Sequence, residues 1–216
     1  MRSTSFTLII AMLVLCIGCA PLLSRFKSIL KRPAGSVEVQ PAEELVDKSL
    51  YVYTNDNSKA NRFSPSGWMG DSMDLKFSGS YQINPSSGTS CLRISYLARG
   101  EKGWAGVYWQ NPANNWGDRK GGYDLSGAKA VTFWARGEEA SVKIAEFKLG
   151  GITGRYSDSD VAWIGPVKLK KKWKKYRIPL KGKDLSYING GFCFVVLKSD
   201  NPRGCTFYLD EIRYEW

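Results

Sequence analysis

The stretch "WAGVYWQNPANNWG" (residues 104–117) places three tryptophans and a tyrosine next to residues that favour turns. Its first seven residues alternate between the two faces of an expected strand. One face suits a hydrophobic core and holds Ala105, Val107 and Trp109. The other face is more open and holds Trp104, Gly106, Tyr108 and Gln110. The proline and asparagines that follow predict a turn, so the stretch indicates a strand with one buried and one outward face.

The same period-two alternation continues from residue 49 to the C-terminus, interrupted by Gly, Pro, Asn, Asp and Ser. It predicts nine strands, near residues 50–53, 73–77, 91–96, 104–110, 129–135, 142–149, 173–180, 191–197 and 205–214. No segment of this part carries the apolar stripe of a helix. We therefore expect an all-β fold, an antiparallel β-sandwich of jelly-roll type, over residues 49–216.

The last two predicted strands flank "SDNPRG" (residues 199–204), which indicates a hairpin. In that hairpin Cys193 faces Asp210 rather than Cys205, so these two cysteines are not cross-strand partners. Alternation alone does not place Cys91 beside either of them. We therefore expect three free, buried cysteines.

The composition excludes some chemistries and favours an anionic partner. The chain has no histidine, which removes Ser-His-Asp and Cys-His nucleophiles and histidine-ligated zinc. The formal net charge of +11 suggests a polysaccharide, a membrane surface or a nucleic acid as partner. We do not expect nucleic acid, because the sequence has no helix-turn-helix or RRM consensus.

The segment "KLKKKWKKYR" (residues 168–177) contains seven Lys or Arg residues and accounts for part of this charge. It fits an exposed strand whose lysines prevent pairing with another strand. It also fits a patch for an anionic ligand or a membrane surface.

The first 18 residues resemble a bacterial signal peptide of the lipoprotein type. Arg2 provides a positive start, an apolar run covers residues 6–17, and a Gly-Cys pair ends the run at Cys19. The pattern departs from the lipoprotein motif at Cys16, where leucine is usual. We expect cleavage of residues 1–18 and a lipid on Cys19. An uncleaved membrane anchor over residues 6–23 is the alternative.

Residues 19–48 are expected to form a lipidated tether and linker, because they include prolines and several basic residues. Within them, residues 22–32 fit a short helix on lipid headgroups, and they fit a disordered segment equally well. Ala20, rather than aspartate, follows the cysteine, which resembles outer-membrane sorting in a Gram-negative cell. We therefore expect an outer-membrane lipoprotein of the bacterial cell envelope, facing the periplasm or the surface.

Three motifs in the body of the chain share one resemblance. They are "GGYDLSGAKAVTFWARG" (121–137), "WKKYRIPL" (173–180) and "FYLDEIRYE" (207–215). Together they resemble the galactose-binding-like jelly-roll domains, including the family 11 carbohydrate-binding modules attached to glycoside hydrolases. The resemblance covers roughly residues 50–216 and implies a carbohydrate ligand without naming it. The same sandwich also serves in an assembly factor of respiratory complex I, so a protein partner is the alternative.

The resemblance also implies a structural calcium ion. Asp210 matches the aspartate of the closing strand, which often belongs to such a site in these modules. Asp56 and Asp74, near the first strands, would supply further oxygen ligands. The alternative is that Asp210 holds a turn or pairs with a nearby Lys or Arg.

Sugars present apolar C–H faces, which suit aromatic rings, and hydroxyl groups, which suit polar side chains. Alternation in "AVTFWARG" points Trp134 and Arg136 outward, away from the core residue Phe133. In "KIAEFKL" it does the same for Glu146 and Lys148. We expect one sheet face to present these residues together, with loops at its rim. The predicted carbohydrate site comprises Trp68, Trp104, Tyr108, Asn114, Asn115, Trp116, Trp134, Arg136, Glu146 and Lys148.

We therefore predict a non-catalytic surface lipoprotein that binds a poly- or oligosaccharide. One alternative is a lipoprotein that uses the same sandwich to bind or assemble another protein. Another is a glycoside hydrolase, which needs two carboxylates about 5–10 Å apart, such as Glu146 with Asp158 or Asp160. The basic surroundings argue against hydrolysis, because they lower carboxylate pKa values and a general acid needs a raised one.

Overall fold

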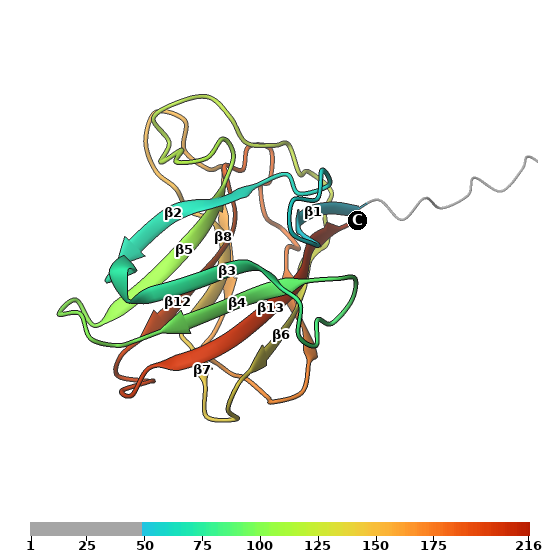
Figure 1. Ribbon diagram of the computed structural model, residues 1–216. Helices are drawn as coiled ribbons and strands as arrows, with labels where there is room; N and C mark the ends of the chain where they lie inside the picture. Colours follow the sequence, from blue (N-terminus) through green and yellow to red (C-terminus); the bar gives the residue numbers. More distant parts are fainter. Residues whose placement is uncertain (1–48) are drawn as a thin grey trace, which may run out of the picture. The chain divides into compact units, whose positions relative to one another are not determined.

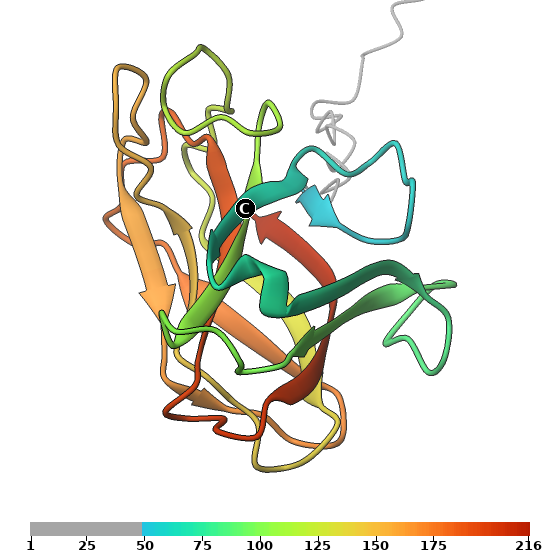
Figure 2. The same ribbon diagram turned by 60° about the vertical axis from the view of Figure 1, so that its left-hand side comes forward.

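The computed structural model describes residues 49–216 and shows two antiparallel sheets packed face to face (Figure 1 and Figure 2). The predicted signal peptide, the tether and the lipidation at Cys19 lie outside the described residues and stay predictions. Within residues 49–216, no helix is long and apolar enough to span a membrane.

The larger sheet has six strands, in the order β11-β6-β13-β4-β3, with β1 paired to β13. Its strands are β1 (Ser49–Tyr53), β3 (Leu75–Tyr81), β4 (Cys91–Tyr96), β6 (Ala130–Gly137), β11 (Lys174–Pro179) and β13 (Cys205–Glu215). A short 3-10 helix, η1 (Ser72–Asp74), leads into β3.

The smaller sheet has five strands, in the order β2-β5-β12-β8-β9. Its strands are β2 (Ser64–Gly70), β5 (Trp104–Gln110), β8 (Glu146–Gly150), β9 (Val161–Ile164) and β12 (Gly190–Leu197). Two short strands, β7 (Lys143–Ile144) and β10 (Val167–Lys168), pair with each other in a separate ladder.

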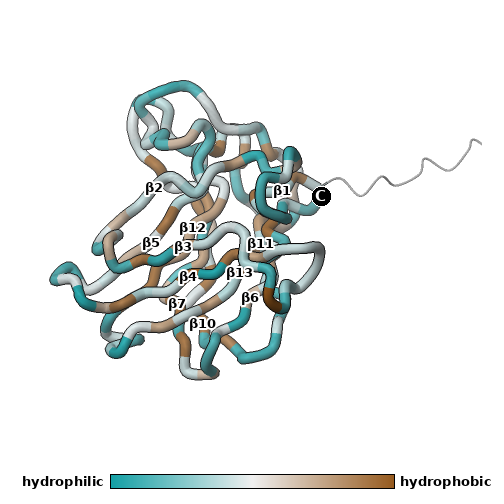
Figure 3. The backbone as a smooth tube through the Cα atoms, in the orientation of Figure 1, coloured by the Kyte–Doolittle hydropathy of each residue, from teal (hydrophilic) through white to brown (hydrophobic). Residues whose placement is uncertain are grey.

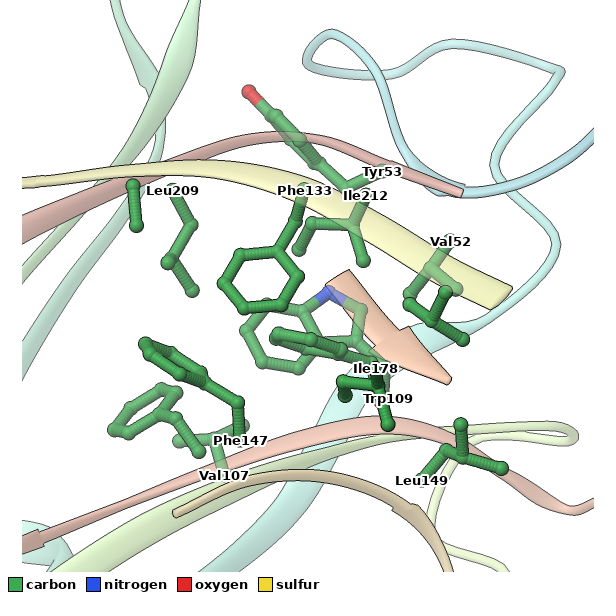
Figure 4. Packing of buried hydrophobic residues seen from close by; sticks show 14 of the residues in the cluster. Val52, Tyr53, Val107, Trp109, Phe133, Phe147, Leu149, Ile178, Leu209 and Ile212 are labelled. Carbon is green, nitrogen blue, oxygen red and sulfur yellow. The ribbon is translucent and has the colours of Figure 1, made fainter. Parts of the chain in front are cut away.

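The core lies between the two sheets and is rich in aromatic rings from both. The Phe133 ring centroid of β6 lies 4.7 Å from that of Phe147 in β8 and 5.1 Å from that of Phe192 in β12. Trp109 of β5 is 1% exposed and lies at the middle of this cluster (Figure 4). Hydrophobic segments follow the strands, and hydrophilic segments gather in the turns (Figure 3). Burial of these large rings removes much apolar area from water, which holds the two sheets together.

The structure confirms the predicted all-β antiparallel sandwich, with 13 strands instead of nine over residues 49–216. The sequence patterns did not predict β2, β9 or β10, and the predicted strand 142–149 divides into β7 and β8. The sequence of β2, "SPSGWMG", contains a proline and two glycines, which disfavour strands. β2 forms at the edge of its sheet, a position where a proline is tolerated.

The predicted hairpin between the last two strands is wrong. β12 lies between β5 and β8 in the five-stranded sheet, whereas β13 lies in the six-stranded sheet. The connection crosses from one sheet to the other, and the rings of Phe194 and Phe207 meet across the core at 5.1 Å. Each strand has an inward apolar face, and packing these faces against each other buries both of them, which a flat hairpin would not do.

The three cysteines within the described residues are free, as predicted. Cys91 and Cys193 are buried, but Cys205 is only half-buried, which corrects the prediction for that residue. Burial raises the pKa of the Cys91 thiol to about 11 and that of Cys205 to about 12, and it also raises the pKa of Cys193. All three thiols therefore stay protonated near neutral pH and are poor nucleophiles.

β11 forms one edge of the six-stranded sheet and pairs with β6 on its inner side. Lys174 and Lys175 on this strand are exposed, as are the lysines of the preceding turn at positions 170–172. This placement agrees with the interpretation that lysines protect an exposed edge from pairing with another strand.

Candidate functional site

One row of side chains crosses the outer face of the five-stranded sheet from edge to edge. The register places in this row, from β9 to β2, Trp163, Lys148, Cys193, Tyr108 and Gly67. The next residues along the strands, such as Phe147 and Phe194, are buried in the core. Because side chains alternate along each strand, the row faces away from the core.

A second row lies one pleat away on the same face and consists of Glu146, Val195, Gly106 and Met69. Gly106 lies close to β12, because a Cβ at this position would be 2.6 Å from the Phe194 carbonyl oxygen. Val195 and Met69 are partly buried and pack against Tyr108 and its neighbours. This row therefore gives the face a shallow, partly apolar floor beside the charged groups.

Two tryptophans are exposed on this face. Trp163 is 57% exposed, and Trp116, in the loop after β5, is 42% exposed. The ring of Trp116 meets that of Tyr108 edge to face, with 6.0 Å between centroids. Neighbouring strands are about 4.8 Å apart, so about 14 Å separates Trp163 from Tyr108, three strands away. We call the surface formed by Trp163, Glu146, Lys148, Tyr108 and Trp116 the outer platform.

Tyr108 supports the outer platform from below and is not itself an exposed stacking surface, which corrects its predicted role. It is 4% exposed, and its hydroxyl donates to the Gly150 carbonyl oxygen at 2.9 Å. Lys148 Nζ lies 5.3 Å from the Tyr108 ring centroid and 3.6 Å from the Glu146 carboxylate. Burial raises the pKa of Tyr108 far above its ordinary value, so Lys148 and Trp116 rest on a neutral ring.

A buried asparagine holds the loop that carries Trp116. The Asn115 side-chain amide donates to the Asn111 carbonyl oxygen at 3.3 Å and to Asn189 Oδ1 at 3.1 Å. Asn115 is therefore buried and committed to the loop, and it does not form the predicted rim of the site. Asn114 is exposed and keeps its side chain available to a ligand.

Trp104 lies on the same outer face, at the start of β5, beside Leu197 of β12. It is half-buried, and a Cβ on Gly70 would lie 2.8 Å from its ring, so the indole packs against the backbone of β2. Tyr108 follows it by four residues, about 14 Å along β5. Trp104 therefore marks the far end of this face.

The structure divides the predicted site between the two sheets, so the prediction of one shared face is wrong. Trp134 and Arg136 point outward as expected, but from β6 in the six-stranded sheet. The contact of Phe133 with Phe147 across the core shows that the outward residues of β6 and β8 point in opposite directions. There the Arg136 guanidinium packs over the Tyr208 ring, 3.6 Å from its centroid.

Trp68 also lies away from the outer platform. It is 41% exposed, but it pairs with the core residue Val107 and packs against Phe77 of β3 at 5.7 Å. Its ring is therefore on the inward side of β2, where it covers the edge between the two sheets.

Asp210, the first residue predicted to bind calcium, holds a loop instead. It is fully buried and accepts hydrogen bonds from the backbone N–H groups of Ser86, Ser87 and Glu211 and from the Ser86 hydroxyl. Burial raises the pKa of this carboxyl, and these hydrogen bonds oppose the shift. Both oxygens are occupied by donors, which agrees with the alternative that Asp210 holds a turn.

Asp74 and Asp56 do not complete a metal site with Asp210. Asp74 accepts two backbone N–H groups of the loop after β4, at 2.6 and 2.7 Å. Asp56 is exposed and accepts a hydrogen bond from Asn57. Within residues 49–216, no group of three or more His, Cys, Asp or Glu side chains is arranged to hold a metal ion. The three predicted calcium ligands therefore do not form a carboxylate cluster.

The three carboxylates considered for hydrolysis are each engaged in other contacts. Asp158 accepts backbone N–H groups at 2.8 and 3.2 Å. Asp160 pairs with Lys183 at 3.1 Å, and a hydrogen bond from the Val161 N–H lowers the pKa of its carboxyl. Glu146 pairs with the lysine of the outer platform. All three carboxylates are therefore engaged within the protein. Burial raises the pKa of Asp158, so the expected lowering of carboxylate pKa values holds for Asp160 and is wrong for Asp158.

The sequence patterns missed Trp163, the most exposed tryptophan of the described residues. It lies in "VAWI", a strand of only four residues, which is short for a period-two signal. The signal was nevertheless present, because Ala162 and Ile164 face the core and alternate with Trp163.

The fold and the outer platform define a class of protein: a β-sandwich that presents an aromatic and charged row across one open sheet. Solved structures that match this fold include carbohydrate-binding modules. A family 30 module matches with a TM-score of 0.54 and 18% identity, over 78% of this chain and 87% of that one. A family 30 module of a cellulosomal cellulase from Clostridium thermocellum matches with a TM-score of 0.50 and 18% identity, over 77% and 96%.

These comparisons confirm that the domain has the jelly-roll fold of carbohydrate-binding modules, as the motifs predicted. A family 11 module of a cellulosomal cellulase from the same bacterium has a TM-score of 0.42 and 17% identity, over 65% of this chain and 79% of that one. No protein-family model and no curated protein matches the sequence. At 18% identity, the likeness concerns the fold.

Proposed function

We propose that this protein is a non-catalytic carbohydrate-binding protein that holds a poly- or oligosaccharide on the outer platform. One observation carries the proposal. Trp163 is exposed at one end of the first row, Trp116 is exposed beside Tyr108 of the same row, and Lys148 lies between them with Glu146 next to it. The fold shared with carbohydrate-binding modules supports the proposal.

The chemistry of the outer platform suits a sugar chain. Each indole offers a rigid apolar surface to the C–H face of a pyranose ring. Lys148 donates hydrogen bonds and Glu146 accepts them, so together they satisfy sugar hydroxyl groups. The buried ring of Tyr108 holds Trp116 and Lys148 in place before the ligand arrives, which lowers the entropy cost of binding.

The dimensions favour a chain over a single sugar. Three strand spacings, about 14 Å, separate the backbone positions of Trp163 and Tyr108, and the Trp116 ring centroid lies 6.0 Å from that of Tyr108. A sugar chain can therefore contact both indoles with different units. The face is an open sheet surface, which a long polysaccharide can cross without a free end.

A lipid anchor at Cys19 is the second part of the proposal. The Ile17-Gly18-Cys19 sequence after an apolar run supports it. The lipid would hold the protein in the outer membrane of the bacterial cell envelope, and residues 19–48 would tether the sandwich to it. Mass spectrometry of the N-terminal peptide is expected to find an acylated Cys19, and Cys19→Ala is expected to release the protein from membranes. A mature protein that still contains residues 1–18 would contradict the proposed lipid anchor.

Binding of the full-length protein to a panel of immobilised neutral polysaccharides and oligosaccharides tests the main proposal. We expect Trp163→Ala to weaken binding of the best ligand about 30-fold, because loss of an exposed stacking ring costs about 2 kcal/mol. Trp68→Ala is the matched control for Trp116→Ala, since the two rings are 41% and 42% exposed. The Trp116 variant is expected to lose affinity, and the Trp68 variant to stay within about twofold of the wild type.

Three results would change the proposal. Equal losses of glycan affinity in the Trp68 and Trp163 variants would show that the binding site is not the outer platform. Absence of glycan binding together with a co-purifying protein would favour the protein-interaction alternative. Cleavage of the bound glycan, abolished by Glu146→Gln, would make the protein an enzyme.

A further inference from the structure

A groove of about 830 Å³ opens on the other sheet, over β3, β4 and β13. The loops at residues 138–142 and 200–204 form its walls. Its strands belong to the six-stranded sheet, so the groove is separate from the outer platform.

The floor of the groove is polar. The hydroxyl oxygens of Ser95 in β4 and Thr206 in β13 lie 2.8 Å apart. The register places Lys76 of β3 beside Ser95 in the same row. The adjacent residues Ile94 and Phe207 are buried in the core, so this row faces outward.

Four cationic side chains line the groove: Lys76, Arg93, Arg99 and Arg203. Among residues 49–216, none of the four has a carboxylate within ion-pair distance. Arg93 lies against the ring of Tyr81 instead. Three of the four are exposed, and Arg93 is half-buried, so all four can reach a ligand.

The acidic residues of the groove are already engaged. Glu138 accepts a hydrogen bond from the Tyr208 hydroxyl. Glu139 pairs with Lys171 at 3.2 Å, and Asp200 pairs with a lysine at 2.7 Å. Among the residues that the structure describes, Glu138 has no cationic partner, but the four cations without a carboxylate partner outnumber it, so the unpaired charge of the groove is positive in sum.

We infer that this groove binds the carboxylate or sulfate groups of an acidic polysaccharide. Arginine forks match the oxygen geometry of such anions, and the hydroxyl floor offers further hydrogen bonds. The cationic excess agrees with the net charge of +11. The floor is recessed between two loops, where the projecting groups of a polymer can enter and a flat lipid surface cannot. The anionic character rests on the groove itself, and the carbohydrate character rests on the proposed function.

Titration of the full-length protein with dextran sulfate, with uncharged dextran as the backbone control, tests this inference at about 0.15 M salt. We expect Lys76→Gln with Arg203→Gln to weaken dextran sulfate binding about tenfold, because charge-assisted hydrogen bonds are lost. The control is Lys120→Gln with Lys181→Gln, which removes the same charge from exposed positions outside the groove. It is expected to change the affinity by at most about twofold. Thermal unfolding of both double variants checks that they remain folded.

Equal weakening in the two double variants would overturn the inference in favour of general charge attraction. Groove-dependent binding to phosphatidylglycerol vesicles without groove-dependent binding to dextran sulfate would also overturn it. Neutral-glycan binding, measured in the same variants, separates this inference from the proposed function. If neutral glycans bind through Trp163 and the groove variant binds dextran sulfate normally, only the groove inference fails. If the groove variant alone loses dextran sulfate and no neutral glycan binds, only the outer platform fails.

Discussion

The outer faces of the two sheets carry similar residues but use them differently. On the six-stranded sheet, the Arg136 guanidinium lies over the Tyr208 ring at 3.6 Å and contacts Trp173 at 5.3 Å. On the five-stranded sheet, Trp163 and Trp116 remain exposed. A ring that already carries a cation has little surface left for a ligand. The comparison shows that the availability of a side chain, more than its type, decides which face suits a sugar.

One part of the six-stranded face, around Glu215, pairs its own charges. The Glu215 carboxylate accepts hydrogen bonds from Thr132, Lys175 and Arg213 at 2.7–3.2 Å. Near Lys76 of β3, Ser95 of β4 and Thr206 of β13, several cationic side chains have no carboxylate partner within residues 49–216, and this part of the face is the cationic groove. Substitutions in the paired region of the six-stranded face should therefore alter stability and leave glycan binding intact. Substitutions beneath the outer platform should alter both stability and binding.

We expect the largest effect on stability from Asp210→Ala on the six-stranded face. The variant leaves the N–H donors of Ser86, Ser87 and Glu211 without their acceptor, which costs about 3 kcal/mol of unfolding free energy. Urea unfolding measures the loss, and glycan affinity is expected to stay within about twofold. Asp56→Ala, at an exposed position, is the control and should cost at most about 0.5 kcal/mol. Loss of glycan binding in the Asp210 variant would break the proposed division between the faces.

We expect a smaller loss of stability, together with a loss of binding, from Asn115→Ala. The variant removes the buried amide that holds the loop of Trp116, at a cost of about 2 kcal/mol. The displaced Trp116 should weaken glycan binding severalfold in the same affinity assay. Asn114→Gly serves as the control for stability, because glycine readily adopts the positive φ of 59° at this position. Normal glycan binding by a destabilised Asn115 variant would show that Trp116 does not contribute to the binding site.

The smallest effect is expected from Glu215→Gln, and it depends on pH. Burial raises the pKa of this carboxyl, but hydrogen bonds from Thr132, Lys175 and Arg213 outweigh it and hold the pKa below its ordinary value. A lowered folded-state pKa stabilises the protein above the unfolded pKa, and this contribution is lost as the pH falls through the folded value. We therefore expect the variant to be about 1 kcal/mol less stable at neutral pH and equal to the wild type in strong acid. A difference that stays constant with pH would show that the effect is steric.

Much of the fold could be predicted from alternation within single strands. Trp109 and Phe133 were expected in the core, and both are buried. Trp134 and Lys148 were expected to point outward, and both do. The site was predicted less well, because the burial of Tyr108 and Asn115 depends on the loops that cover these residues. A period-two pattern describes a single strand and carries no information about the loops that pack over it.

The sequence by itself determined which side chains of a strand face the core, because that choice depends on a local repeat of two residues. Only the tertiary structure decided which sheet each strand joins. β12 pairs with β5 and β8, whereas β13, next in the chain, pairs with β1, β4 and β6. Such pairings join distant segments, and burial of both apolar faces in one core selects among them. That packing separated Arg136 from Lys148 and left Trp163 and Trp116 on one open face.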